Sequence, residues 1–361
     1  MKKILALSLA LIMVFVLVAC SNDTADSGSQ APEASSAAPA EKSETPAETE
    51  DNGGSEGGKT GKVALILKSL NHAFFADMQE AAKEKADELG MEIYIDGVID
   101  ESDNEGIIQL IENAITQQCD VIAVTTSDST ALVQSVKKCN DAGIPFITID
   151  ADIDQAALDA AGAEVVTFIG TDNREGGRLI GEYCAELFKD ASEEVQVAIL
   201  EGLPGTETAT NRKAGFEEGI SSNDKIKVVA SQNADWQIEL GLNVGQNILQ
   251  ANPDIEFIFG SNDYMALGAL QAAIAANLDV QVMGFDAIQD ALDSIKDGKL
   301  FGTLGQFPGK MGATAVQMAY ELINDPSKTY DRVTYTGCYV VTKENLDDYL
   351  AEAKDLSKLP I

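Results

Sequence analysis

The chain has 361 residues, and 59 Asp and Glu against 25 Lys and Arg give it a formal net charge of −34 at pH 7. A surface this acidic repels nucleic acid and anionic lipid head groups, which excludes partners of those classes. His72 is the only histidine, which removes most Ser-His-Asp and Cys-His arrangements, so the sequence predicts no enzyme.

Residues 1–20 are predicted to be a lipoprotein signal peptide. Lys2 and Lys3 precede an apolar run that ends at Ala19, shorter than the roughly 20 apolar residues of a membrane span. The LVAC that follows resembles the lipobox of bacterial lipoproteins, in which the cysteine is lipidated. Cys20 is therefore the predicted lipidation site, and an ordinary signal peptide with an accidental cysteine is the alternative.

Residues 21–60 are predicted to be a disordered acidic tether. They contain no aromatic and no large aliphatic residue, so they cannot bury enough apolar area to offset the entropy of ordering. GGSEGGKT at 53–60 fits the P-loop pattern of nucleotide-binding proteins. A P-loop follows a strand and opens a helix, whereas here acidic sequence precedes and a strand-like run follows, so the match is interpreted as a coincidence.

Residues 61–361 alternate between short apolar runs and amphipathic segments. Continuous apolar runs are typical of parallel strands covered on both faces, and their alternation with helices predicts open, doubly wound sheets in an α/β chain long enough for two domains. The predicted strands are 62–68, 91–97, 121–126, 145–150, 165–172, 195–202, 225–232, 257–263, 280–286, 300–306 and 335–343. The predicted helices are 74–90, 105–118, 129–143, 174–190, 211–221, 240–250, 265–277, 288–298 and 308–325.

Polar and aromatic side chains gather after these strands, at the edge where doubly wound sheets bind ligands. They are Asn71, His72, Phe74, Phe75, Asp150, Arg212, Trp236, Asn262, Asp263, Asp286 and Gln306. Carboxylates, amides and a guanidinium can grip hydroxyl groups, and flat rings cover the C–H faces of a sugar, so the set favours a small polyhydroxylated ligand. A single Asp or Asn at such a position is also a common helix N-cap, and the two phenylalanines are equally suited to a core.

Several blocks resemble the ribose- and allose-binding proteins of bacterial ABC importers, in the order and spacing of that family. They include IGTDNREGGRLIGEY, EGLPGTETATNRKAGF, GSNDYMALGAL and VMGFD, and the resemblance covers residues 62–342. It implies a periplasmic binding protein of type I, with two Rossmann-like lobes joined by crossovers near 171–173, 306–308 and 335–338. The implied lobes are 61–172 plus 307–336, and 173–306 plus 337–361.

The resemblance also implies a function. Such a protein captures a monosaccharide or similar small polyol by hinge closure, without a cofactor, and delivers it to an ABC permease with a separate ATPase subunit. With the predicted signal, this one would be an exported monomer, lipid-anchored to the outer face of the cell membrane. A sensory role, in which a chemoreceptor or kinase reads the loaded protein, is the alternative.

Site residues follow from the resemblance position by position. Phe74, Phe75 and Trp236 match the aromatic residues that enclose the sugar in the family. The residues that match the family's hydrogen-bonding partners of the sugar are Asp150, Arg212, Asn262, Asp286 and Gln306. Lys68 matches a lysine of the allose-type proteins, with a solvated strand end as the alternative.

Three positions depart from the ribose-type pattern. His72 and Thr125 stand where Asn is usual, and Ala151 replaces a second ligand-binding Arg, which puts ribose itself in doubt. A ligand with fewer hydroxyls there, or one that reaches Lys68 and His72, stays open.

No metal site is predicted. DADID at 150–154 spaces carboxylates like a calcium loop, but Gln155 and Ala161 replace the glycine and glutamate that such a loop needs.

Besides Cys20 the cysteines are Cys119, Cys139, Cys184 and Cys338, with no C-x-x-C. They are interpreted as free core thiols, with a Cys119–Cys139 disulfide as an open alternative. Asp150 and Asp286 could also form a glycosidase pair, but the resemblance supplies a non-catalytic use for both.

Overall fold

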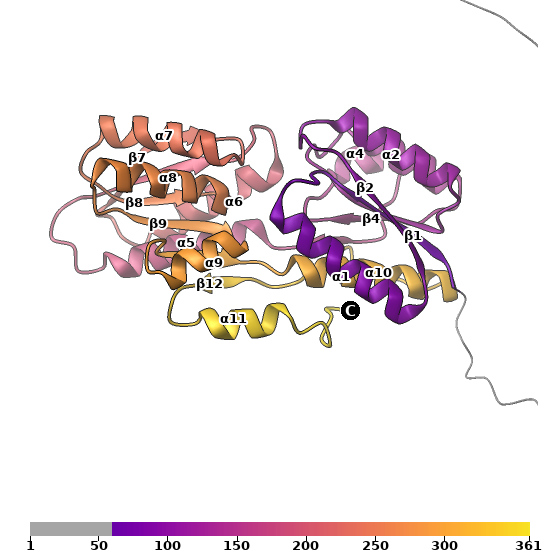
Figure 1. The fold of residues 1–361 in the computed structure, drawn as a ribbon. Coiled ribbons are helices and arrows are strands. Elements are labelled where there is room, and N and C mark those ends of the chain that lie inside the picture. The colour runs from indigo at the N-terminus through magenta and orange to yellow at the C-terminus, as the bar shows by residue number, and fades with distance from the viewer. Residues whose placement is uncertain (1–59) are drawn as a thin grey trace, which may run out of the picture. The chain divides into compact units, whose positions relative to one another are not determined.

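The structure, a computed structural model, describes residues 60–361 (Figure 1). The predicted signal peptide, Cys20 and all but the last residue of the tether lie outside the described residues. Within residues 60–361 no helix is long and apolar enough to cross a membrane.

The first lobe is built on a six-stranded sheet in the order β11-β5-β4-β3-β1-β2, all of whose neighbours are parallel. Its strands are β1 (Lys62–Leu67), β2 (Glu92–Gly97), β3 (Val121–Thr125), β4 (Phe146–Ile149), β5 (Phe168–Gly170) and β11 (Val333–Tyr335). Its helices are α1 (Ala73–Leu89), α2 (Asn104–Thr116), α3 (Val133–Asp141), α4 (Gln155–Ala161) and α10 (Pro308–Asn324).

The second lobe repeats this plan with the order β12-β10-β9-β8-β6-β7 (Figure 1). Its strands are β6 (Val195–Glu201), β7 (Ile226–Asn233), β8 (Ile255–Gly260), β9 (Gln281–Asp286), β10 (Gly302–Gly305) and β12 (Tyr339–Val341). Its helices are α5 (Asn173–Leu187), α6 (Glu207–Ile220), α7 (Ile238–Ala251), α8 (Asp263–Ala276), α9 (Gln289–Lys296) and α11 (Leu346–Ala353).

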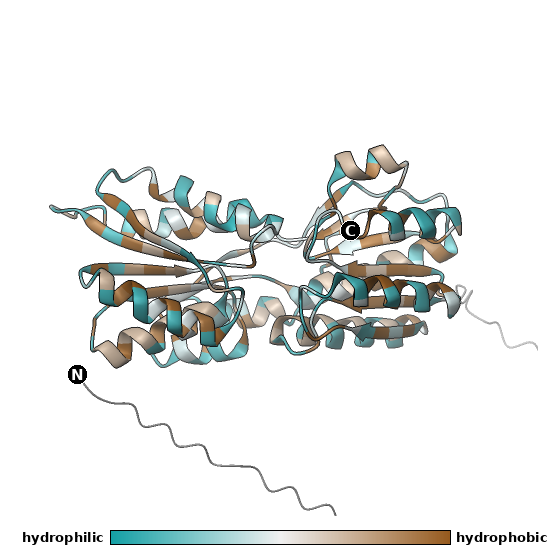
Figure 2. Ribbon diagram, turned by 90° about the horizontal axis from the view of Figure 1, so that it is seen from above, coloured by the Kyte–Doolittle hydropathy of each residue, from teal (hydrophilic) through white to brown (hydrophobic). Residues whose placement is uncertain are grey.

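Helices on both faces explain why the central strands are mostly apolar. In β1, Val63, Leu65 and Leu67 pack under α1 and α10, while Ala64 and Ile66 pack under α2, α3 and α4. The second sheet is likewise enclosed by α5 and α6 on one face and by α7, α8 and α9 on the other. Figure 2 shows the hydrophobic colour concentrated along the strands and on the inward sides of the helices. The predicted α/β fold of two doubly wound lobes is confirmed.

Four details differ from the sequence prediction. The predicted strand 335–343 is wrong, because Gly337 adopts φ 83° and the chain leaves one sheet as β11 and enters the other as β12. β12 pairs antiparallel with β10, so the second sheet is not wholly parallel. The seven-residue α4 and eight-residue α11 carry too few turns for a clear amphipathic signal, and both escaped prediction. Helix α6 begins at Glu207, which places Arg212 in its second turn rather than its first.

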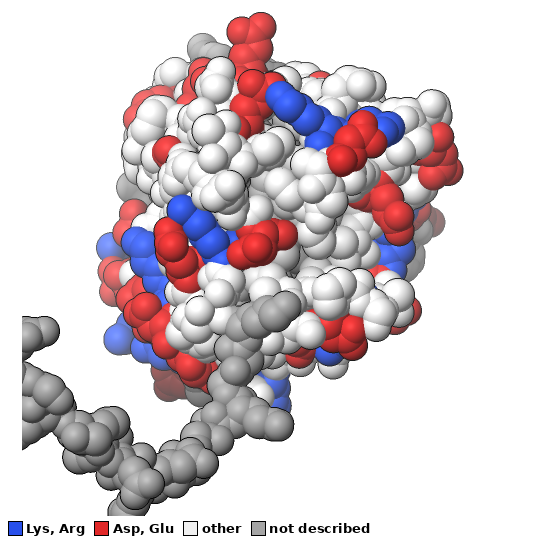
Figure 3. All heavy atoms as spheres, turned by 90° about the vertical axis from the view of Figure 1, so that its right-hand side faces the viewer, with Lys and Arg blue, Asp and Glu red and all other residues white. Residues whose placement is uncertain are grey.

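Charged side chains are interspersed on the face of the first lobe shown in Figure 3, where blue and red groups lie beside one another without a basic stripe.

Cys119, Cys139, Cys184 and Cys338 are free in the structure, so the alternative Cys119–Cys139 disulfide is not formed. Burial raises the pKa of Cys139 and of Cys184 to about 12, as expected for inert core thiols.

Candidate functional site

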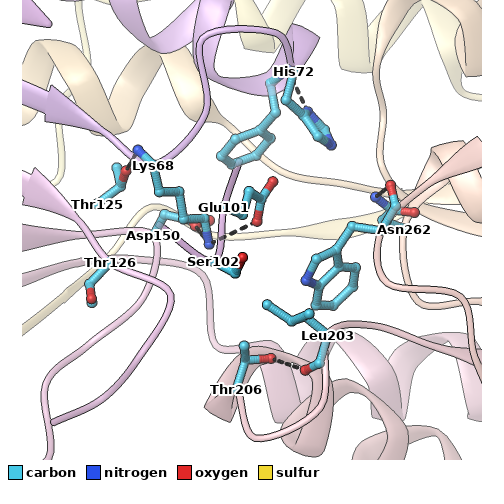
Figure 4. Close-up of polar contacts among 12 residues, drawn as sticks. Lys68, His72, Glu101, Ser102, Thr125, Thr126, Asp150, Leu203, Thr206 and Asn262 are labelled. Carbon is cyan, nitrogen blue, oxygen red and sulfur yellow. Dashed lines mark hydrogen bonds and ion pairs between the residues drawn. The ribbon is translucent and has the colours of Figure 1, made fainter. Parts of the chain in front are cut away.

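A small cavity lies between the carboxyl ends of the two sheets. Both lobes contribute to its wall, which consists of Lys68, His72, Phe74, Phe75, Glu101, Asp150, Thr208, Arg212, Trp236, Asn262 and Asp286. All the predicted site residues except Gln306 are thus brought together. Figure 4 shows Lys68, Glu101 and Asp150 on one side of this opening and Asn262 on the other.

The first lobe presents a buried ion pair to the cavity. Nζ of Lys68 lies 2.9 Å from Oδ2 of Asp150, and the backbone N–H of Lys68 donates to Oγ1 of Thr125 at 2.7 Å. Burial alone would lower the pKa of Lys68, but the neighbouring carboxylates of Asp150 and Glu101 raise it, so the ammonium stays charged. Lys68 is therefore a fixed donor of the cavity wall rather than a solvated strand end.

The second lobe presents a guanidinium held in a network. Arg212 donates from Nε to Oδ1 of Asn173 at 2.9 Å and from Nη1 to the backbone oxygen of Ser261 at 2.8 Å. The same Nη1 donates to Oδ1 of Asp286 at 3.2 Å, and the guanidinium lies 3.6 Å from the centroid of the Phe285 ring. With these partners the buried side chain has one orientation, which preorganises its remaining donors.

Asp286 is the most constrained residue of the site. Its φ of 121° lies in a region that side-chain-bearing residues rarely adopt, and the following Ala287 has φ 62°. Asp263 holds this turn, because its carboxylate accepts from the backbone N–H of Ile288 at 2.9 Å and from Oγ1 of Thr303 at 2.6 Å. Neither Asp286 nor Asp150 caps a helix, so the N-cap alternative is wrong for both.

Burial raises the pKa of the Asp286 carboxyl to about 7, against the opposing effect of Arg212. Burial and the charge of Asp286 also raise the pKa of Asp263 well above its usual value. Burial is the main cause of both shifts, and hydroxyl groups of a ligand would add donors to the Asp286 carboxylate, which lines the cavity.

Gln306 does not line the cavity. Its side chain is 1% exposed, and its Nε2 donates to Oδ1 of Asp286 at 2.7 Å. The structure thus places it behind Asp286, and its contact with a ligand stays a prediction.

Three aromatic rings form the apolar walls of the cavity. Phe74 and Phe75 belong to the core under α1, as the core interpretation expects, and they also line the cavity. Their contact with a sugar stays a prediction. Trp236 follows β7 with φ 65°, and its indole packs on Gly202, where any Cβ would overlap the ring. The glycine therefore sets the depth at which the tryptophan lies.

Asn262 combines two tasks. Its Oδ1 accepts from the backbone N–H of Met265, which caps α8, and its Nδ2 donates to the backbone oxygen of Trp236 at 3.2 Å. The N-cap alternative is thus correct for Asn262, and the same amide ties the Trp236 turn to α8.

His72 brings the two lobes into contact. Its ring lies 4.5 Å from that of Tyr264 on α8, and the hydroxyl of Tyr264 accepts from the backbone N–H of Ala73 at 3.4 Å. Nδ1 of His72 accepts from the backbone N–H of Phe74 and caps α1, an arrangement that requires this nitrogen to be unprotonated. Burial and the charge of Lys68 lower the pKa of His72 to about 4.

We expect acid to destabilise the protein through His72. A neutral His72 stabilises the fold fully above its ordinary pKa near 6.5, and this contribution is lost as the pH falls toward 4. The nearby charges are Lys68 and Arg212, which favour the neutral ring, and Asp150, which opposes them. The free energy of unfolding of the wild type, measured with urea relative to the His72→Asn variant, should fall by about 2 kcal/mol from pH 7 to pH 5. A constant difference would show that His72 does not titrate in this range.

Sequence reasoning missed two residues of the wall. Glu101 lies in the loop four residues beyond the end of β2, and Thr208 lies in the first turn of α6. The rule that parallel strands carry their ligand residues at their carboxyl ends could have indicated both, since each follows a strand of its lobe. Within residues 60–361 no group of three or more His, Cys, Asp or Glu side chains is arranged to hold a metal ion.

Comparison with known proteins identifies the family. Residues 63–327 match the model of the periplasmic binding protein domain. The ribose import binding protein of Salmonella typhimurium is 37% identical over 264 residues, which are 72% of this chain and 84% of that protein. The D-ribose/D-allose-binding protein of Pseudomonas aeruginosa is 37% identical over 289 residues, covering 78% of this chain and 88% of that protein.

A solved structure extends the comparison to three dimensions. It is an ABC transporter periplasmic solute binding protein from Actinobacillus succinogenes with bound D-allose, 37% identical, with a TM-score of 0.76 over 80% of this chain and 100% of that one. Members of this family are non-enzymatic, extracytoplasmic sugar-binding proteins, which fits an exported chain. With its two doubly wound lobes and the cavity between them, the chain belongs to the periplasmic binding proteins, as a sugar-binding, ABC-transporter solute-binding protein of the ribose/allose type.

Proposed function

We propose that this protein captures one neutral monosaccharide or a similar small polyol between its lobes and delivers it to an ABC importer, while a lipid on Cys20 anchors it to the membrane. The observation that carries the proposal is the make-up of the cavity, in which buried ion pairs from both lobes face each other between aromatic rings. The aromatic rings and the ion pairs of both lobes line one small cavity, so the site suits a single sugar ring rather than an oligosaccharide.

The polar groups of the cavity suit hydroxyls that both donate and accept. Lys68 and Arg212 can donate to sugar oxygens, and the carboxylates of Asp150 and Asp286 can accept from sugar hydroxyls. Two positions that differ from the ribose-type pattern offer little to a ligand. The hydroxyl of Thr125 accepts a hydrogen bond from the backbone N–H of Lys68, and Ala151 has no side-chain donor. We therefore favour a sugar whose hydroxyls reach Lys68 and His72.

Capture proceeds by closure of one lobe on the other. We propose that the lobes comprise residues 61–172 plus 307–336 and residues 173–306 plus 337–361, which is supported by the sheet membership of β11 and β12. The contact between His72 and Tyr264 joins the lobes beside the cavity and favours the closed form. A sugar bound by both lobes shifts the population further toward closure, and the permease recognises that form of the monomer.

We expect Cys20→Ala to release the protein from the membrane. The proposed lipid is attached to the sulfur of Cys20, so the variant should lose incorporation of a clickable fatty acid and move to the soluble extracytoplasmic fraction. Cys338→Ala is the matched control, because it removes a cysteine from the folded part of the chain and should leave both properties unchanged. Continued labelling of the Cys20→Ala variant would contradict the anchor.

The sugar-binding proposal is tested by thermal shift. Purified protein without its lipid is screened against D-ribose, D-allose, other aldoses and myo-inositol, because a ligand that binds only the native state raises the melting temperature. At least one neutral sugar should raise it by several degrees in a concentration-dependent way. A flat response to every neutral sugar and polyol would contradict the proposal.

A further inference from the structure

Glu101 lines the cavity, and its carboxylate makes a single polar contact within the described part of the chain. It reaches the cavity from the loop between β2 and α2, and 18% of its side chain is exposed. Its Oε2 lies 3.9 Å from Nζ of Lys68, and among residues 60–361 this ion pair is the only polar contact of its carboxylate. Figure 4 shows Glu101 beside Lys68 and Asp150, on the side of the cavity that faces Asn262.

The cavity wall contains three carboxylates, including that of Glu101, but only two cations, Lys68 and Arg212. Lys68 has a closer carboxylate in Asp150 at 2.9 Å, and Arg212 has its own partner in Asp286 at 3.2 Å. His72 contributes no charge at neutral pH, because its pKa is lowered to about 4. Each cation of the wall therefore has a nearer carboxylate than Glu101, whose distance of 3.9 Å to Lys68 is the longest of the three ion pairs.

An excess carboxylate with few donors determines which ligands it accepts. The carboxylate of Glu101 has few donors around it, because the ion pair with Lys68 at 3.9 Å is its one polar contact among residues 60–361. Burial also raises the pKa of Glu101, although Lys68 opposes this. Sugar hydroxyls would supply these donors. A ligand carboxylate or phosphate would instead face an uncompensated negative charge at short range, where low solvent exposure leaves the repulsion poorly screened.

We propose that Glu101 is a specificity-determining residue of this site, which accepts hydrogen bonds from hydroxyls of a neutral sugar and excludes acidic sugars such as uronates and sugar phosphates. This inference rests on the proposed function, since it requires a sugar in the cavity. It goes beyond a purely structural role for Glu101 in holding Lys68, because such a role would affect neutral and acidic sugars alike.

The test compares Glu101→Gln with the wild type. D-ribose, D-allose, D-glucose and D-galactose are the neutral probes, and D-glucuronate, D-galacturonate and D-ribose 5-phosphate are the acidic ones. Dissociation constants are measured by calorimetry at pH 7 and fixed ionic strength. Glu101→Gln should weaken binding of the tightest neutral sugar at least tenfold and reduce the preference for it over the acidic probes at least tenfold.

Glu105→Gln is the matched control, because it removes the same charge four residues away on an exposed position of α2. It should leave both quantities unchanged. If the wild type binds a neutral sugar and Glu101→Gln keeps both affinity and preference, the inference is overturned and the proposed function stands. If the wild type binds no neutral sugar or polyol, including those of the thermal-shift screen, the proposed function fails, and this inference fails with it.

Discussion

The Asp286→Ala variant should bind its sugar at least about 100-fold more weakly than the wild type, a loss of about 3 kcal/mol. Asp286 is 6% exposed, and its Oδ1 accepts from both Arg212 and Gln306. Truncation removes an acceptor from the cavity and leaves a guanidinium that is 4% exposed without its carboxylate. Both effects act against binding, since a misplaced Arg212 also loses its contact with the ligand.

One further variant separates the charge of Asp286 from its shape, and a second variant is a control at a nearby exposed residue. Asp286→Asn keeps the side-chain volume but loses the charge, so it should retain part of the fold's stability while sugar affinity stays low. Asp290→Ala removes an exposed carboxylate four residues away and should bind as the wild type does. Calorimetry with the sugar that raises the melting temperature most would measure all three. Near-native affinity in Asp286→Ala would contradict the assigned site.

The Gly177→Ala variant should lose about 3 kcal/mol of its free energy of unfolding. Helices α5 and α6 cross with almost no space between their backbones, because Gly177 and Gly181 on one face Gly215 and Gly219 on the other. A Cβ on Gly177 would overlap the backbone oxygen of Arg212, and backbone cannot rotate away as a side chain can. The substitution must therefore push α6 outward and carry Arg212 away from Asp286.

Gly309→Ala is the control for the loss of a helical glycine. Its Cβ would meet the Cβ of Ala81 at 3.4 Å, an ordinary contact, so higher helix propensity should leave the variant as stable as the wild type or slightly more stable. Urea unfolding measures both variants. Equal stabilities would show that the crossing of α5 and α6 adjusts freely. Weaker sugar binding by Gly177→Ala would additionally link this crossing to the position of Arg212.

Much of the site was predictable because doubly wound sheets bring the carboxyl ends of their strands to one edge. Asp150 follows β4, Asp286 ends β9 and Trp236 follows β7, so knowing the strands was enough to place these residues together. The apolar runs were visible because helices cover both faces of each sheet, which removes polar residues from the strands.

What escaped prediction depends on loops and backbone conformation. The strand-end rule indicates the loop after β2, but nothing in the sequence specifies that Glu101 is the residue of this loop that lies beside Lys68. The left-handed conformation of Asp150, Trp236 and Asp286 is also invisible in the sequence, since it is imposed by tertiary contacts on residues that do not prefer it. Gln306 shows a third limit, because a strand-end amide can support a neighbouring carboxylate instead of lining the cavity.

A crystal structure of the protein with the sugar that raises its melting temperature most is the most direct test of the account. We predict a single sugar ring in the cavity between the lobes, with its C–H faces against Phe75 and Trp236 and its hydroxyls bonded to Asp286, Arg212 and Asp150. A sugar bound elsewhere on the protein, with this cavity empty, would contradict the account.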